Sequence, residues 1–346
     1  MRGPLAAGSV HSGRFVIEAL AGEGGSSEVY RAVDRESGRL VALKISHEVA
    51  TEGRTGSDQH ASERFLREAE LLEMLSHRGI VEHVAHGVTD GVPYLAMEWL
   101  EGEDLEQRLE RGALTIDEVL ELAFNVASAL SAAHERGVIH RDVKPSNVFL
   151  GQQKIENTKI LDFGIARVDG GAQFTRFGEA LGTPAYMAPE QAKGARDLDA
   201  RTDVFALGCV LYECLAGRPP FWADHPLAVM AKILIEEPPA IATLRPDVPE
   251  ALAKLVGAML SKERDARPAN GGAVHEAVRA IRKSLQPKPR SERPPPPAAP
   301  PPPRAVLTNR EQKLLSVLFV ARVADTLASE GEAYHCLLYT SDAADE

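Results

Sequence analysis

The chain has 346 residues, enough for one large domain or two ordinary ones, and is 44% apolar and 26% charged. These fractions are close to globular averages, so wholesale disorder and a fibrous fold are both excluded. The 39 basic and 50 acidic side chains give a net charge of −11. Sequence-independent DNA binding needs a basic face, so such an acidic chain is a poor candidate for it.

The cysteines and the apolar runs indicate a cytoplasmic protein. Cys209 and Cys214 lie in an apolar run, which favours small buried thiols, and no Cys-x-x-Cys pair suggests zinc. Residues 1–13 lack the apolar stretch of a signal peptide. No run reaches the ~18 apolar residues that span a bilayer. We therefore expect no nucleic-acid partner and, within this fragment, no membrane association.

The predicted elements change character along the chain. Residues 15–115 combine short strand patterns with one helix pattern, whereas residues 116–283 are mostly helical. A capping box at residues 115–118 opens the first long helix, which we expect to stop near Gly137. This order predicts an α+β fold with a small sheet-rich lobe before a larger helical lobe. The expected early elements are strands at Phe15 to Leu20, Glu28 to Val33, Leu40 to Ile45 and Val92 to Trp99, and a helix at Ser62 to Ser76.

A proline-rich segment follows the helical part. Half of residues 285–304 are proline, which fixes φ and has no N–H to donate. The segment cannot join a helix or a sheet, so we expect an extended linker. A ligand for an SH3-like domain is the alternative.

The first motif with chemical content is a glycine-rich turn at residues 22–27. A Walker loop is excluded because no Lys-Ser/Thr follows, and a dinucleotide fingerprint is excluded because Val29 and Tyr30 indicate a strand. A plain hairpin turn is one interpretation. The other is a hairpin whose backbone N–H groups cover phosphates, which glycine permits because it has no Cβ.

The second motif is a lysine, Lys44, at the end of an apolar strand. A buried ammonium is costly unless it is paired. On the next predicted helix, at ~100° per residue, Glu68 lies within the apolar stripe, whereas Glu63 and Glu70 point away. We therefore expect Glu68 to pair with Lys44.

The strongest signal is a series of motifs in a fixed order. His140-Arg141-Asp142-Val143-Lys144-Pro145-Ser146-Asn147 is followed by Asp162-Phe163-Gly164, Gly182-Thr183-Pro184 and Ala188-Pro189-Glu190. Each piece alone is an ordinary turn or loop, but their joint occurrence makes chance negligible. Together with the glycine turn, Lys44 and Glu68, they resemble the eukaryotic-like serine/threonine protein kinases of bacteria. Ser27 stands where the family has its third glycine. A serine at this position would make the loop stiffer than a glycine would.

The resemblance implies a bilobal kinase fold and the transfer of the γ-phosphate of ATP to Ser or Thr hydroxyls of protein substrates in bacterial signalling. The implied cofactors are ATP and Mg²⁺, with Mn²⁺ as an alternative. Asp142 would accept the substrate proton, Lys144 would stabilise the transferred phosphate, and Asn147 and Asp162 would hold the metal. A dimer through the kinase domain, supporting autophosphorylation in trans, is left open.

Further roles follow from the same resemblance. Lys44, aligned by Glu68, would hold the α/β-phosphates. The other expected ATP contacts are Gly22, Gly24 and Ser27 in the loop, Val29, Ala42 and Phe149 around adenine, the gatekeeper Met97, the hinge residues Glu98 and Leu100, and Asp104 at the ribose. The expected structural positions are the pair Glu190 and Arg267, Asp203 holding the catalytic loop, and a column of Leu72, Val84, His140 and Phe163.

The segment from Asp162 to Glu190 carries a candidate regulatory site. Thr175 is the only hydroxyl between Gly164 and Gly182, and Arg141 offers a cation to a phosphate there. A phosphosite at Thr175 and a plain solvated loop residue are both open. In this family Thr183, like Lys144, is a mark of Ser/Thr specificity.

The resemblance covers residues 14–283, with an N-lobe at 14–98 and a C-lobe at 102–283. Residues 1–13 are then an N-terminal tail, 284–304 the linker and 305–346 a truncated second domain. Its run Leu314 to Val320 faintly resembles the first strand of class III nucleotide cyclases, but Ala321 replaces their metal-binding aspartate. We interpret the last eleven residues as a non-native tail.

Two other functions are alternatives to that of an active protein kinase. A pseudokinase scaffold would bind ATP or a partner without transfer, but Lys44, Asp142, Asn147 and Asp162 argue against it. A small-molecule phosphotransferase of related fold is disfavoured by Thr183 and by Ala188-Pro189-Glu190, which serve protein substrates.

Overall fold

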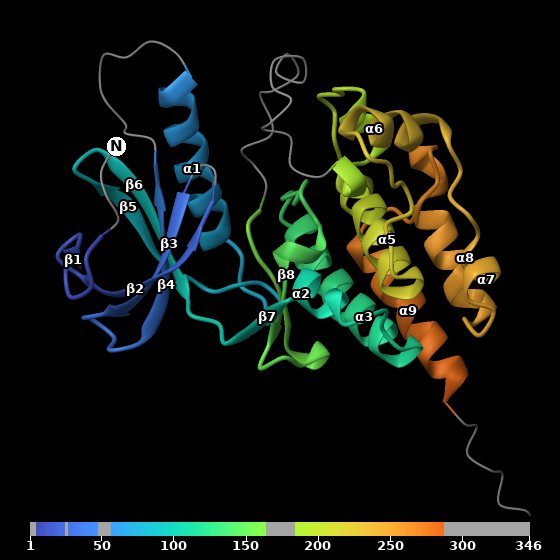
Figure 1. Ribbon diagram of the computed structural model, residues 1–346, viewed down its shortest axis with the longest axis horizontal. Coiled ribbons are helices and arrows are strands. Elements are labelled where there is room, and N and C mark those ends of the chain that lie inside the picture. Colours follow the sequence, from blue (N-terminus) through green and yellow to red (C-terminus); the bar gives the residue numbers. More distant parts are fainter. Residues whose placement is uncertain (1–4, 25–26, 48–56, 164–183, 287–346) are drawn as a thin grey trace, which may run out of the picture. The chain divides into compact units, whose positions relative to one another are not determined.

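The computed structural model describes residues 5–24, 27–47, 57–163 and 184–286, which belong to one unit (1–286) distinct from residues 287–346. The first part is an antiparallel sheet of six strands in the order β1-β2-β3-β4-β6-β5 (Figure 1). Helix α1 (Ser57–Glu73) lies between β4 and β5 in the chain and contacts β5 and β6. The strands are β1 (Val10–His11), β2 (Phe15–Glu23), β3 (Ser27–Asp34), β4 (Leu40–Ser46), β5 (His83–Thr89) and β6 (Val92–Glu98).

The four expected strands are present, and the structure adds β1 and β5 to this sheet. Strand β5 was missed because its sequence, HVAHGVT, has little of the alternation expected for a strand, and none of its residues is fully buried. Strand β1 lies within the residues that the sequence assigned to a tail. Helix α1 begins at Ser57, five residues before the expected start, and ends at Glu73.

Strand β4 shows how this sheet positions functional groups. Val41, Leu43 and Ile45 enter a buried cluster with residues of β2, β3 and β6. Their neighbours Ala42 and Lys44 therefore face the opposite side of the sheet, because successive side chains alternate. The apolar half of the strand holds the sheet together and leaves the other half for the site.

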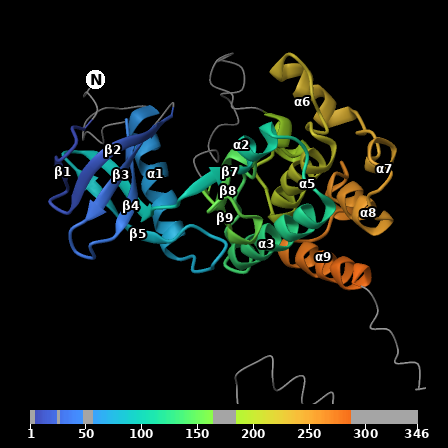
Figure 2. The same cartoon turned by 60° about the horizontal axis from the view of Figure 1, so that its bottom comes forward.

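The second part is mainly helical and begins with a small sheet of β7 (Gly102–Asp104), β8 (Val148–Gly151) and β9 (Thr158–Ile160). Figure 2 shows this sheet beside α2 (Leu105–Glu110) and α3 (Ile116–His134). The expected capping box is present, since Thr115 and Glu118 bond each other's backbone N–H. The remaining helices are α4 (Pro189–Ala192), α5 (Ala200–Ala216), α6 (Pro226–Ile235), α7 (Ile241–Leu244), α8 (Glu250–Met259) and α9 (Gly271–Leu285).

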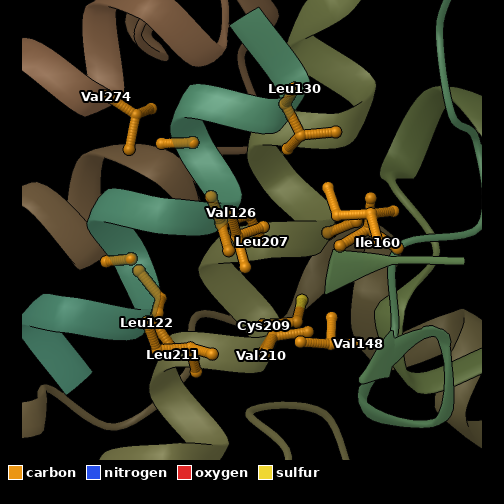
Figure 3. Packing of buried hydrophobic residues seen from close by; sticks show 14 of the residues in the cluster. Leu122, Val126, Leu130, Val148, Ile160, Leu207, Cys209, Val210, Leu211 and Val274 are labelled. Atoms are coloured by element: carbon orange, nitrogen blue, oxygen red, sulfur yellow. The ribbon is translucent and has the colours of Figure 1, made fainter. Parts of the chain in front are cut away.

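Helix α5 is the centre of this part, and nearly all of its residues are buried. Figure 3 shows Leu207, Val210 and Leu211 of α5 among side chains of α3, β8 and β9. Cys209 and Cys214 are buried free thiols, as the sequence predicted. Helix α9 packs on α3 so closely that a Cβ at Gly271 would lie 2.6 Å from the backbone nitrogen of Ser131. None of the described helices combines the length and apolar composition needed to cross a membrane.

Candidate active site

The side chain of Lys44 lies between two carboxylates that come from distant segments. Its Nζ is 2.8 Å from Oδ1 of Asp162 and 3.4 Å from Oε1 of Glu68. Burial lowers the pKa of Lys44, but the carboxylates of Asp162 and Glu68 outweigh this and raise the pKa above its ordinary value. Lys44 therefore stays protonated. The predicted pair of Lys44 and Glu68 is brought together, and Asp162 joins it directly.

The two carboxylates beside Lys44 respond differently to their surroundings. Burial raises the pKa of Glu68 to about 7, against the attraction of Lys44. Burial also acts to raise the pKa of Asp162, but its closer contact with Lys44 holds that pKa below the ordinary value. Near neutral pH, Asp162 is therefore ionised, whereas Glu68 titrates.

The catalytic-loop residues predicted from the motif form a hydrogen-bonded cluster. Nζ of Lys144 is 2.9 Å from Oδ2 of Asp142. Nδ2 of Asn147 donates to the backbone oxygen of Asp142 at 2.8 Å and to its Oδ2 at 3.2 Å. The Asp142 N–H donates to Nδ1 of His140 at 3.2 Å. The carboxylate of Asp142 is thus fixed by an amide and a cation from its own loop.

A fully buried carboxylate, that of Asp203 in α5, binds the backbone of this loop. Its oxygens accept the backbone N–H groups of His140 at 2.8 Å and Arg141 at 2.7 Å, as the sequence predicted. His134 of α3 also lies 2.8 Å from Asp203 through Nε2. Since the Gly271 N–H donates to Nδ1 of His134, the Nε2 atom carries the proton and donates to Asp203.

This link through His134 was missed because it requires α9 to pack against α3, which no local pattern reveals. It ties the N-terminal end of α9 to the catalytic loop. Arg141 has φ 68° and Asp162 has φ 43°, both in the left-handed region that is unfavourable for non-glycine residues. Such conformations persist where the surrounding bonds over-determine them, as Asp203 does for Arg141.

The pair Glu190 and Arg267 is present and buried. Two guanidinium nitrogens of Arg267 donate to the two oxygens of Glu190 at 2.8 and 2.9 Å, and the residues are 4% and 6% exposed. Thr202 donates to the same carboxylate at 3.1 Å. Gln191, next to Glu190, donates to the backbone oxygen of Arg141 at 2.9 Å. The end of the 162–190 segment is thereby bonded to the catalytic loop.

Of the residues expected around adenine, Val29, Ala42 and Met97 lie on neighbouring strands of the six-stranded sheet, and Phe149 lies on β8 of the small sheet. Ala42 is opposite Met97 across β4 and β6, Val29 is opposite Lys44, and Phe149 is opposite Asp104. These pairs put Val29, Ala42 and Met97 on the sheet face that carries Lys44.

The hinge and ribose positions also have partners that the sequence did not indicate. The carboxylate of Glu98 accepts from Nζ of Lys159 and, at 2.8 Å, from the Glu82 N–H, so its side chain is engaged by the protein. Asp104 accepts from the Gln107 N–H at 2.8 Å as the N-cap of α2. Leu100 is partly buried against the helical core.

The glycine-rich turn is described in part. Gly24 donates its N–H to the backbone oxygen of Ser27 at 2.8 Å, and among the described residues no atom lies within 4 Å of a Cβ placed at Gly22. Thr175 and Thr183, and the expected linker and truncated domain beyond residue 286, lie outside the described residues.

The expected column is confirmed for its His140–Phe163 contact and wrong for Val84. The rings of His140 and Phe163 have centroids 4.7 Å apart, and Leu72 is buried in the same cluster as Phe163. Val84 instead packs against the other cluster, on the far side of the sheet. A bulge between His83 and Ala85 shifts the alternation by one residue, so His83 and not Val84 lies opposite Met97.

Comparisons with known proteins agree with this geometry. The protein kinase domain family matches residues 15–279. Serine/threonine-protein kinase pkn3 of Myxococcus xanthus is 38% identical over 280 residues, which are 78% of this chain and 50% of that protein. The DNA damage-responsive serine/threonine-protein kinase RqkA of Deinococcus radiodurans is 39% identical over 287 residues, 82% of this chain and 42% of that protein.

Two mycobacterial proteins extend the comparison. PknA of Mycobacterium tuberculosis is 37% identical over 289 residues, 82% of this chain and 64% of that protein. The crystal structure of the PknI kinase domain of the same species matches with a TM-score of 0.60 and 29% identity, covering 81% of this chain and 98% of that one. The chain thus spans about half the length of the curated relatives it matches.

Proposed function

Because the chain belongs to the protein kinase family, we propose that residues 14–283 form an ATP-dependent serine/threonine kinase acting on proteins in bacterial signalling. One observation carries the proposal. The ammonium of Lys44 is held by Glu68 and Asp162, and Lys144 and Asn147 hold the carboxylate of Asp142. Phosphoryl transfer depends mainly on positioning and charge neutralisation, and these residues supply both.

The roles of the residues follow from their charges and contacts. Asp142 would accept the proton of the substrate hydroxyl, because its carboxylate is oriented by Asn147. Lys144 would neutralise charge on the transferred phosphate. Lys44 would exchange its contact with Asp162 for the α/β-phosphates while keeping Glu68.

The oxygen donors of Asp162 and Asn147 fit a hard divalent cation, for which we propose Mg²⁺, with Mn²⁺ as an alternative. Such an ion would neutralise phosphate charge. Among the described residues, no three His, Cys, Asp or Glu side chains form a metal site by themselves. We further propose that ATP contacts the glycine-rich turn, the adenine and hinge positions and the ribose position, of which Asp104 already has one oxygen engaged as a helix cap. These residues are Gly22, Gly24, Ser27, Val29, Ala42, Met97, Glu98, Leu100, Asp104 and Phe149.

The test of this function is the variant Asp142→Asn. We expect it to reduce phosphorylation of a generic protein substrate strongly in single-turnover assays while leaving ATP affinity, measured separately, nearly unchanged. Asp265→Asn is the matched control, because Asp265 is an exposed carboxylate paired with Arg201. An Asp142→Asn enzyme as active as the control would refute the proposal.

We also propose regulation by phosphorylation of Thr175, with Arg141 as the cation that receives the phosphate. Purified protein incubated with Mg-ATP should gain phosphate at Thr175 by mass spectrometry, and Thr175→Ala should be less active than the phosphorylated enzyme. Fully active enzyme without phosphate at Thr175 would exclude this. Autophosphorylation in a dimer, the linker at 284–304 and a cyclase-like remainder at 305–346 are proposals that rest on the sequence alone.

A further inference from the structure

Two histidines meet on β5, which is an edge strand of the six-stranded sheet. Nε2 of His83 is 2.9 Å from Nδ1 of His86, and their ring centroids are 5.1 Å apart. Residues three apart on a regular strand face opposite sides of a sheet. The bulge between His83 and Ala85 cancels this, since His83 lies opposite Met97 and His86 opposite Leu95, which share one face of β6.

The same face carries Lys44, which lies opposite Leu95 on the other side of β6. Lys44 reaches Glu68 of α1 from this face, so α1 covers it. Glu73, the last residue of α1, lines an open cavity of about 560 Å³ together with His83, Ser76 and Glu82. Of the two histidines, His83 lines this space, which is also lined by apolar side chains and by the cations Arg78 and Lys159.

The ring nitrogens are chemically suited to a metal ion. Burial lowers the pKa of His83 and the neighbouring His86 lowers it further, while Glu73 opposes them. Nitrogens bound 2.0–2.1 Å from a metal in adjacent positions 90° apart would lie about 2.9 Å from each other. The observed contact has this length, but it is a hydrogen bond, so one of the two nitrogens carries its proton. Metal binding therefore requires that ring to move its proton to its other nitrogen and both rings to turn, so that both lone pairs face the ion.

We propose that His83 and His86 form a binding site for a divalent transition-metal ion, with Cu²⁺ bound most tightly. Imidazole ligands suit Cu²⁺, Ni²⁺ and Zn²⁺, and adjacent positions near 90° are those of a tetragonal Cu²⁺ or Ni²⁺ centre. With two protein ligands, water completes the coordination and binding is readily reversible. Mg²⁺ prefers oxygen ligands, so this site is chemically distinct from Asp162 and Asn147.

The test is a Cu²⁺ titration of the untagged, metal-free full chain, followed by electron paramagnetic resonance without nucleotide and with Mg²⁺ present. We expect one Cu²⁺ per chain with nitrogen ligands. His86→Gln should weaken binding by roughly tenfold or more, because losing a ligand costs at least as much as losing its supporting partner. His225→Asn is the control, since it keeps an acceptor at the cap of α6 and should bind Cu²⁺ like the wild type.

His83→Gln should lose the site in the same way, and its melting temperature without metal shows whether it folds. If it does not, His86→Gln alone decides. Competition by Zn²⁺ or Ni²⁺ but not by further Mg²⁺ would support the site. Equal Cu²⁺ affinity in wild type and His86→Gln, or a wild-type spectrum without nitrogen ligands, would overturn the proposal.

Discussion

In the helical part, the carboxylates that organise the catalytic loop are enclosed and saturated with hydrogen bonds. Asp203 is 0% exposed and accepts two backbone N–H groups and a histidine, and Glu190 is bound in a two-pronged pair by Arg267. In the sheet part, Lys44 is held by Glu68 and by Asp162, whose side chain is 44% exposed. The first set is built as a fixed frame, whereas the second leaves a cation free to exchange partners with a ligand.

We expect the largest loss of stability when the buried pair of Glu190 and Arg267 is broken. Arg267→Leu leaves Glu190 as a buried carboxylate without its cation, which we expect to lower the free energy of unfolding by about 3–5 kcal/mol. Arg201→Leu is the matched control, because Arg201 pairs with Asp265, which is 93% exposed, and such pairs contribute about 1 kcal/mol or less. Denaturant unfolding measures both. Similar losses in the two variants would contradict the idea of a buried frame.

The two regions also differ in how far the sequence predicts them. The Lys44–Glu68 pair follows from one helical stripe and the cost of a buried charge, and the Glu190–Arg267 pair follows from family motifs. The contact of Lys44 with Asp162 joins residues 118 positions apart, and the bond of Gly271 to His134 spans 137. Neither leaves a local pattern. The bulge beside His83 shifted one face of β5 by a residue, which is why Val84 was misplaced.

Removing the cation of Lys44 should reduce activity more than stability. Lys44→Met removes the charge expected at the phosphates, and we expect turnover to fall roughly 10²–10³-fold, the usual cost of losing one positioned electrostatic group. The free energy of unfolding should fall by less than in Arg267→Leu, because Glu68 can take up a proton and Asp162 is partly solvated. A kinase assay beside a melting curve checks both, with the exposed Lys254→Met as control. Robust activity in Lys44→Met would make the lysine purely structural.

The smallest expected effect is a pH dependence confined to the sheet part. Burial raises the pKa of Glu68 to about 7 from its ordinary value of 4.5, so the folded chain binds this proton more tightly than the unfolded one. The stability that Glu68 contributes is therefore fully present below about pH 4.5 and is lost as the pH rises through about 7.

The activity should show the opposite pH dependence to the stability. Protonation of Glu68 weakens its attraction for Lys44, so kcat/KM should fall as the pH drops below about 7, while the melting temperature gains the contribution from Glu68. Glu68→Gln should flatten that limb of the pH–rate profile, because the amide does not titrate, and should leave limbs set by other groups in place. Parallel pH profiles of kcat/KM and melting temperature for wild type and Glu68→Gln separate the two effects. An unchanged acidic limb in Glu68→Gln would assign it to another group and leave Lys44 held mainly by Asp162.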